Sequence, residues 1–236
     1  MTETTTLGLP LVAAAQAQKH VTVNEALSRL DALVQMTLTT RGATTPPSLP
    51  GEGTLHAVGN GAGGDWVGQD GRLALWLNNG WVFLDPKAGW RAWSVEDGGV
   101  LTFDGSDWIA GGVALSENGA ATVSRVVELV HAVGTGSTSV VTGALPDGAL
   151  ILGVSARVIG AVGGASGFDI GVAGDADRFA AGVGVVSGAV AASVRGVPGV
   201  YPGGGDIVLT ATGSAFDGTG QVRLAIHLSE IRAPRG

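Results

Sequence analysis

The sequence predicts a mainly β protein with a short N-terminal helix, a small Trp-rich β-hairpin domain and a C-terminal antiparallel β-sandwich or jelly roll. Three observations support this fold class. The chain has 41 glycines and 45% hydrophobic residues but only 14% charged residues, a balance typical of short strands joined by tight turns. Only Ala15–Val34 has a helical apolar spacing, and all six tryptophans lie between Trp66 and Trp108. We therefore expect three domains: residues 1–45, 46–112 and 113–236.

The helix of the first domain is predicted from four apolar residues in a 4-3-4 spacing, which places them on one helical face: Val23, Leu27, Leu30 and Val34. Thr22 and Glu25 match the capping box that begins many helices. A helix of about 14 residues is marginal alone, and the same four residues fit an a/d seam over two heptads. The seam must pack on the Trp-rich domain or on copies of itself, and the heptad fit favours copies.

The second domain begins after a polar, proline-rich link in which Pro46 and Pro47 exclude a continuing helix. Leu73–Leu84 is a predicted hairpin, with Asn79-Gly80 supplying the positive φ angles of its turn. Val100–Ile109 repeats this design around Asp104-Gly105, which suggests a duplicated hairpin unit.

The tryptophans of this domain allow two interpretations. Their flat faces can stack on sugar rings, or they can fill the core of a domain too small for ordinary side chains. We favour the core for most of them. Trp90 and Trp93 lie in no clear alternating strand, so we expect these two to be exposed and to bind glycan.

The third domain contains no tryptophan, and its apolar runs are separated by glycine clusters. Along the last of these runs, Val222, Leu224 and Ile226 alternate with other residues in the period-2 pattern of a half-buried strand. Several such strands at short spacing predict a sandwich or jelly roll. The expected strands are Thr122–Val133, Ala149–Val162, Phe168–Ala173, Asp206–Thr212 and Gln221–Ile231.

A polar cluster interrupts the third domain and comprises Asp169, Asp175, Asp177 and Arg178. Its carboxylates are suited to Ca²⁺ or to glycan hydroxyls, although the spacing is not that of an EF-hand. The alternative is a loop in which the aspartates form Asx turns and Arg178 pairs with one of them. We favour the loop and keep the four residues as candidate glycan contacts.

Composition and spacing argue against several other functions. The chain has no cysteine, and its four histidines are dispersed, so we expect neither a metal site nor a cofactor. A net charge of -7 with only two lysines disfavours nucleic acid. Interrupted apolar runs predict no membrane insertion, and the missing basic n-region predicts no signal peptide. No pair of carboxylates lies in a recognisable catalytic motif, so we expect no catalytic residues and a non-enzymatic protein.

Two segments, Leu9–Gln35 and Phe103–Trp108, resemble a family of phage-type appendage proteins, the domain of unknown function DUF2793. Gly143–Val158 and Phe168–Phe179 resemble the same family more weakly. The resemblance implies a fibre or head spike on the surface of a tailed phage or gene transfer agent, assembled in the bacterial cytoplasm.

In that context the helix would form a homotrimer, and the N-terminal arm would contact other head or tail proteins. The C-terminal domain would attach to host surface polysaccharide. Two alternatives remain open: a depolymerase that cleaves this polysaccharide, and a capsid or tail decoration without a ligand.

Overall fold

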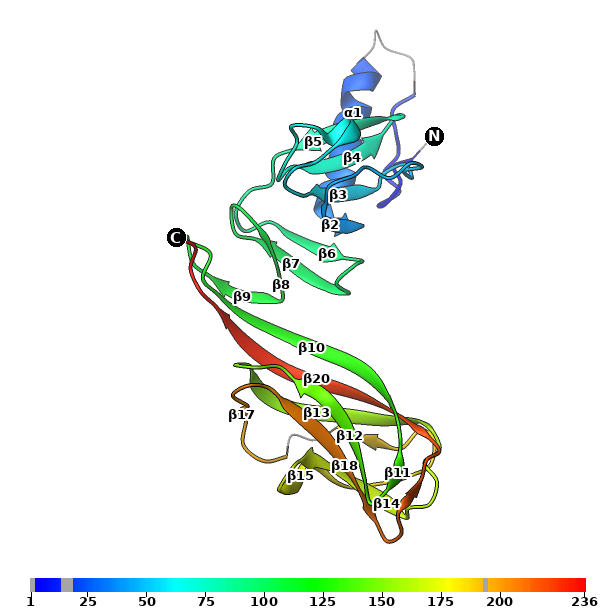
Figure 1. Ribbon diagram of the computed structural model, residues 1–236. Helices are drawn as coiled ribbons and strands as arrows, with labels where there is room; N and C mark the ends of the chain where they lie inside the picture. The colour runs from blue at the N-terminus through cyan, green and yellow to red at the C-terminus, as the bar shows by residue number, and fades with distance from the viewer. Residues whose placement is uncertain (1–2, 14–18, 193–194) are drawn as a thin grey trace. The chain divides into compact units, whose positions relative to one another are not determined.

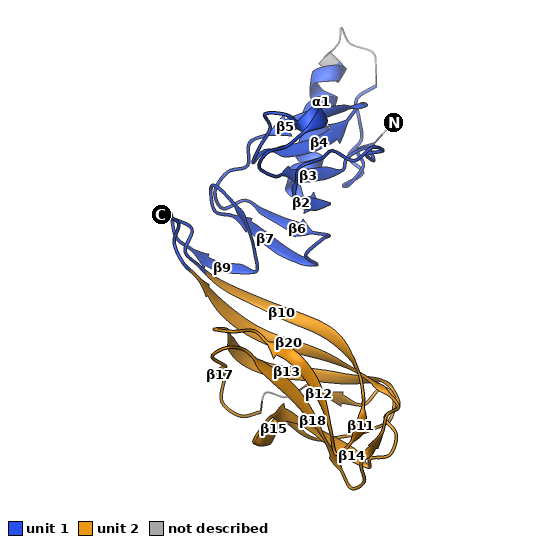
Figure 2. Ribbon diagram, viewed as in Figure 1, with its two compact units in different colours: residues 1–121, 233–236 blue, residues 122–232 orange. Residues whose placement is uncertain are grey.

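The computed structural model describes residues 3–13, 19–192 and 195–236. It confirms a mainly β fold with one short N-terminal helix and several antiparallel sheets. The chain divides into two compact units (Figure 2): unit 1 holds residues 1–121 and 233–236, and unit 2 holds residues 122–232. The predicted boundaries at 45/46 and 112/113 both fall inside unit 1.

Unit 1 contains α1 (Lys19–Val34), a 3-10 turn (Gly64–Trp66) and two four-stranded sheets (Figure 1). Each sheet is a three-stranded antiparallel meander with one parallel strand added at its edge. The first sheet comprises β2 (Thr40–Ala43), β3 (Leu55–Val58), β4 (Leu73–Leu77) and β5 (Gly80–Leu84). The second comprises β1 (Thr37–Leu38), β6 (Arg91–Ser94), β7 (Gly99–Phe103) and β8 (Trp108–Ala110), and β9 (Gly112–Leu115) follows it.

One extended segment, residues 37–43, supplies the parallel strand of both sheets. The switch occurs between two neighbouring residues: Val95 N–H donates to the Leu38 carbonyl at 2.9 Å, and Thr39 N–H donates to the Leu55 carbonyl at 2.8 Å. The segment therefore joins the two meanders. Because its strands pair with residues beyond the proline-rich link, the link does not separate a domain.

The two predicted hairpins are present, but the turn of the first lies one residue earlier than expected. Asn78 and Asn79 have φ angles of 53° and 62°, whereas Gly80 is the first residue of β5 and pairs with Leu77. A two-residue type I′ turn requires positive φ at both central positions, which asparagine tolerates. In the second hairpin, Gly105 has a φ of 105°, as its predicted turn requires.

Most tryptophans of unit 1 belong to its core. Trp66 is fully buried and meets Trp81 edge-on, with ring centroids 5.2 Å apart. Trp108 is also buried, and Trp76, Trp81 and Trp90 are half-buried. Trp93, at 49% exposure, is the tryptophan that most clearly faces solvent. Large aromatic side chains thus fill a small core, as favoured from the composition.

Unit 2 is an antiparallel jelly roll of two facing sheets. One sheet has the path β10-β20-β13-β16, with β17 continuing the edge beside β13, and the other is β12-β18-β14-β15. Successive strands mostly alternate between the sheets, the double Greek key of a jelly roll. The bounds are β10 (Ala121–Ala132), β12 (Thr138–Leu145), β13 (Leu150–Gly160), β14 (Gly167–Val172), β15 (Asp175–Val183), β16 (Val190–Ala191), β17 (Gly199–Val200), β18 (Gly205–Thr212) and β20 (Gln221–Arg232), with a small pair β11 (Thr135–Gly136) and β19 (Phe216–Asp217).

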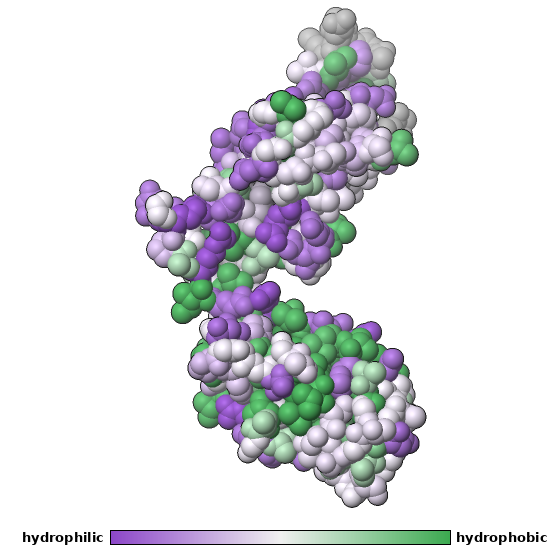
Figure 3. All heavy atoms as spheres, in the orientation of Figure 1, coloured by the Kyte–Doolittle hydropathy of each residue, from purple (hydrophilic) through white to green (hydrophobic). Residues whose placement is uncertain are grey.

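The inward faces of the two sheets form one continuous core. On β20, Val222, Leu224 and Ile226 are fully buried, which confirms the alternation predicted for this strand. From the opposite sheet, Phe168 and Leu209 are also fully buried. The outward face of the sheet that contains β10 is partly apolar. Figure 3 shows hydrophobic residues over the β10 side of unit 2, where Val126 and Val130 are more than half exposed.

Candidate functional site

The N-terminal segment of unit 1 is tied to α1 by the buried carboxylate of Asp31, which is only 3% exposed. It accepts hydrogen bonds from Thr4 Oγ1 at 2.6 Å, Leu7 N–H at 2.7 Å and Thr6 N–H at 2.8 Å. Burial acts to raise the pKa of Asp31, but these hydrogen bonds outweigh it and hold the pKa below its usual value. Asp31 is therefore an ionised anchor for residues 4–7.

A second anchor holds the end of the same segment. The Asn24 side chain accepts from Val12 N–H at 2.8 Å and donates to the Val12 carbonyl at 3.0 Å. Residues 3–13 are consequently fastened along α1 at both ends, where sequence analysis expected an arm directed toward other proteins. The Ala/Gln stretch of that arm, Ala14–Gln18, lies outside the described residues.

The start of α1 differs from the predicted capping box. The helix already includes Lys19, so Thr22 lies within it and cannot be its cap. Glu25 instead forms an i,i+4 ion pair with Arg29 at 2.6 Å on the exposed side of the helix.

The predicted seam of α1 faces outward. Val23, Leu30 and Val34 are 43%, 52% and 60% exposed, and Leu27 is half-buried. The faces that turn inward carry Asn24 and Asp31, which hold the N-terminal segment, and Ala32 and Leu33, which pack in the core beside the sheets. The apolar stripe is thus left largely exposed in one chain, whereas the carboxylate of Asp31 is buried. We call these four residues the α1 stripe.

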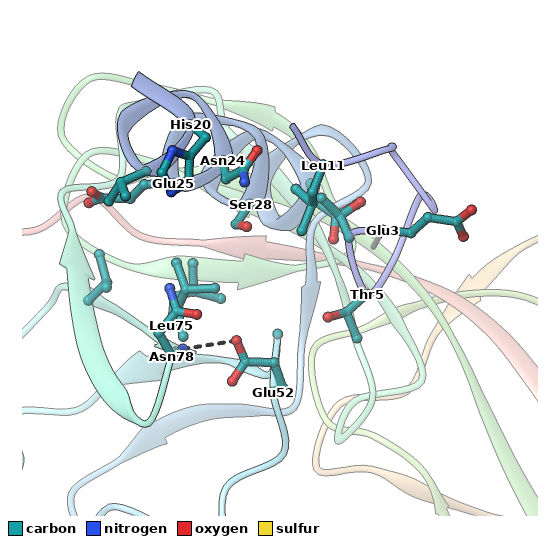
Figure 4. Close-up of a pocket in the computed structure, with 16 residues that line it drawn as sticks. Glu3, Thr5, Leu11, His20, Asn24, Glu25, Ser28, Glu52, Leu75 and Asn78 are labelled. Atoms are coloured by element: carbon teal, nitrogen blue, oxygen red, sulfur yellow. Dashed lines mark hydrogen bonds between the residues drawn. The ribbon is translucent and has the colours of Figure 1, made fainter. Parts of the chain in front are cut away.

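A cavity of about 440 Å³ separates the first turns of α1 from the β4–β5 hairpin (Figure 4). It exists because α1 presents short or polar side chains here, which do not fill the space above the sheet. His20, Asn24 and Ser28 line the helical wall, and Leu75, Leu77 and Val82 form an apolar floor. Its size falls in the range of small-ligand sites, roughly 300–1,000 Å³. No local sequence pattern marks this site, because it arises from packing between distant segments.

Among the side chains that the structure describes, those that line this cavity include the carboxylates of Glu3, Glu25, Asp31 and Glu52. Glu52 Oε1 accepts a 2.9 Å hydrogen bond from Asn78 N–H, drawn in Figure 4, which fixes this carboxylate beside the apolar floor. His20 Nδ1 is buried and has no hydrogen-bond partner among the described residues, although a bond fixing the turn into the helix would be expected of it.

The two predicted glycan-binding tryptophans differ in environment. Trp93, on β6, is exposed and pairs across the sheet with Val100, which is also half exposed. Arg91, two residues earlier on the same strand face, is exposed as well. Trp90 instead packs against the core of unit 1, so its ring is less accessible than expected. Trp93 thus presents an aromatic surface suited to sugar stacking, and Trp90 supports the sheet beneath it.

The polar cluster of unit 2 lies on the β14–β15 hairpin. All four of its residues belong to strands, although a loop was expected around Asp175 and Asp177. Asp169 Oδ1 accepts from Gly182 N–H at 2.7 Å, Asp175 lies 3.9 Å from Arg178, and Asp177 pairs with Arg195. Arg178 also donates to the Val197 carbonyl. The pairing of Arg178 with an aspartate agrees with the interpretation favoured from sequence, but Asx turns do not account for the cluster.

Within residues 3–13, 19–192 and 195–236, no three histidine, aspartate or glutamate side chains gather so that they could hold a metal ion. No helix among them has the length and apolar character that crossing a membrane requires.

Comparison with known proteins gives one family match. Residues 23–109 match the model of the DUF2793 family, described as a protein of unknown function, over less than half of the chain. The match includes Val23–Gln35 and Phe103–Trp108 and confirms the resemblance to the family over these residues. The weaker resemblance in unit 2 lies outside the match. No curated protein matches.

Among solved structures, a chain of "Cyanophage Pam1 capsid asymmetric unit" is similar at 20% identity and a TM-score of 0.31, covering 51% of this chain and 86% of that chain. A TM-score this low supports no conclusion about fold or function.

Proposed function

We propose that this chain is a structural subunit of a phage-type particle, an appendage that associates as a homotrimer through the α1 stripe. The observation that carries this proposal is the orientation of α1, which buries Asp31 and packs Ala32 and Leu33 on the core while Val23, Leu30 and Val34 are exposed. Burial of this apolar surface between copies would favour their association by about 25 cal/mol for each Å² removed from water. The particle context itself comes from the resemblance of the N-terminal segment and its family match.

The proposed contact with the host is a surface polysaccharide, and Trp93 is its first candidate contact. An exposed indole beside Val100 and Arg91 offers a stacking face and a hydrogen-bond donor. Asp169, Asp175, Asp177 and Arg178 remain the proposed contacts in unit 2. Three copies on one appendage would raise the avidity of weak single sites by factors of about 10² to 10⁴.

A non-enzymatic role is part of the same proposal. Retention of the full chain on immobilised host capsule or lipopolysaccharide tests the attachment, with Trp93→Ala expected to weaken retention and Val95→Ala, a nearby exposed residue, expected to leave it unchanged. No retention of a trimeric wild-type protein would reject attachment in favour of a particle decoration. New reducing ends in the polysaccharide would instead identify a depolymerase.

The assembly claim is tested separately by molar mass in solution. We expect three times the 23.4 kDa of one chain at micromolar concentration. A monomer over that range would reject the homotrimer, whatever the polysaccharide experiment gives.

A further inference from the structure

We propose that the outer edge of β12 pairs with the same edge of a second copy of this chain, antiparallel and centred on Val140. β12 belongs to unit 2, whereas the α1 stripe and Trp93 belong to unit 1. The inference therefore goes beyond the proposed function and does not depend on it. It rests on the exposed main-chain groups of β12, on the protection of other edges in unit 2 and on the sequence of the strand.

β12 is the last strand of its sheet, and β18 is its only neighbour among the strands that the structure describes. At the beginning of this pair, Ala211 N–H donates to the Ser137 carbonyl at 2.9 Å. Because hydrogen-bonded residues alternate along an antiparallel pair, every second residue of β12 directs its N–H and C=O groups away from β18. These residues are Thr138, Val140 and Thr142.

The side chains of the same three residues are exposed, with Val140 at 45%. The register of β12 against β18 shifts only after Val141, so the strand is regular around Val140. Main-chain donors and acceptors at the spacing of a strand are satisfied together by another extended segment, as in β-strand addition. β12 thus presents a template for one further strand.

Other edges of unit 2 carry features that prevent such pairing. At the opposite end of the same sheet, Asp177 of β15 pairs with Arg195, and Arg178 donates to the Val197 carbonyl. In the facing sheet, β16 and β17 pair with β13 and border it. Charged residues and covering segments are the usual protection of edge strands. β12 differs from these edges, because Thr138–Leu145 contains no charged residue and no proline.

The sequence of β12 is complementary to itself in an antiparallel arrangement. When Val140 of both copies lies at the centre, Thr138 of each copy is opposite Thr142 of the other. Val–Val and Thr–Thr are favourable cross-strand pairs. The net charge of -7 opposes association of copies, but this edge adds no charge to the repulsion. The two-fold contact is closed and self-complementary, and its small area predicts a weak affinity.

The test follows hydrogen exchange of the full chain by NMR at about 20 µM and about 1 mM, which bracket a dissociation constant on the order of 0.1 mM. At the higher concentration we expect exchange of the Thr138 and Val140 amides to slow by about fourfold. The amides of Ser139 and Val141 already face β18, so their exchange should not change. This alternation distinguishes strand pairing from contact through side chains.

Two variants locate the contact. Val140→Lys places two lysines opposite each other at the two-fold axis, so the slowing at Thr138 should disappear. Val186→Lys makes the same change at a 66% exposed position outside the strands of unit 2, and should keep the slowing. If Val140→Lys does not fold, the exchange pattern of the wild type decides alone.

Four results would each overturn the proposal: exchange at Thr138 and Val140 that is independent of concentration, equal slowing at Ser139 and Val141, slowing that survives in Val140→Lys, or slowing lost equally in Val186→Lys. The proposed trimer is measured separately at micromolar concentration, where the β12 contact is dissociated. A monomeric wild type that still shows the alternation would reject the trimer and support the β12 contact.

Discussion

Thr4 Oγ1 donates a 2.6 Å hydrogen bond to Asp31 Oδ1 in a buried site, and so links the N-terminal segment to the last turn of α1 across 27 positions of the chain. This bond helps to explain why the Asp31 side chain turns inward. The carboxylate also accepts hydrogen bonds from the amides of Thr6 and Leu7. The apolar stripe of the same helix is left for another contact.

Replacing Asp31 with alanine should detach this segment. Three buried or half-buried donors would lose their acceptor, so we expect the free energy of unfolding of unit 1 to fall by about 2–3 kcal/mol. Urea unfolding followed by tryptophan fluorescence measures this, because all six tryptophans lie in unit 1. Hydrogen exchange at Thr6 and Leu7 should accelerate.

Asp85→Ala is the matched control for Asp31→Ala. Asp85 pairs with Arg72 on the surface of the same unit and is itself 62% exposed, so its loss should cost under about 1 kcal/mol. Equal losses in the two variants, or unchanged exchange at Thr6 and Leu7 in Asp31→Ala, would show that Asp31 does not anchor the segment.

The stability of unit 1 should depend on pH through His56. This ring is 4% exposed, lies 2.9 Å from Thr40 Oγ1 and contacts Trp66 and Trp81; its burial lowers the pKa. The unfolded state, with a pKa near 6.5, then binds the proton more readily than the folded state. Stability is therefore complete above about pH 6.5 and declines as pH falls toward the folded pKa, by at most about 1.4 kcal/mol per pH unit.

Substitution identifies the histidine responsible for this slope. His56→Phe removes the titrating group and keeps an aromatic ring against the two tryptophans, so the fluorescence-detected decline between pH 7 and pH 5 should flatten. His227→Phe, in unit 2, should leave it unchanged. A slope of wild-type size in His56→Phe would assign the effect to other groups.

Backbone strain in the Asn78-Asn79 turn can be tested by substitution. Asn79 has a φ of 62°, which costs a residue with an ordinary Cβ about 1–2 kcal/mol. Asn79→Ala should destabilise unit 1 by roughly 1 kcal/mol, whereas Asn79→Gly should be nearly neutral because glycine adopts this angle freely. Thermal unfolding of the two variants gives the difference directly, and similar loss in both would exclude backbone strain as the cause.

Sequence patterns predicted the elements whose conformation is indicated by their own residues. The alternation in β20 and the long apolar runs of β10, β13, β14 and β18 are visible in the chain itself, because each of these strands packs apolar side chains against the core of unit 2. The jelly roll followed from several such runs.

Features set by distant partners could not be predicted in this way. The short strands β1 and β2 have no alternation of their own and exist because β6 and β3 accept them as parallel neighbours. The start of α1 at Lys19 overrides a good capping box at Thr22. No local pattern marks Asp31, and only the fold brings Thr4 to it. The cavity beside His20 likewise depends on two segments meeting.

The central claim is that the α1 stripe joins copies of this chain, and the molar mass of a stripe variant tests it most directly. Leu30→Asp/Val34→Asp should sediment as a monomer of 23.4 kDa with unchanged tryptophan fluorescence, while the wild type and the control Val67→Asp/Val113→Asp sediment as trimers. Both control positions are exposed valines of unit 1 outside the stripe. A monomeric wild type, or a stripe variant that keeps the trimer mass, would contradict the account.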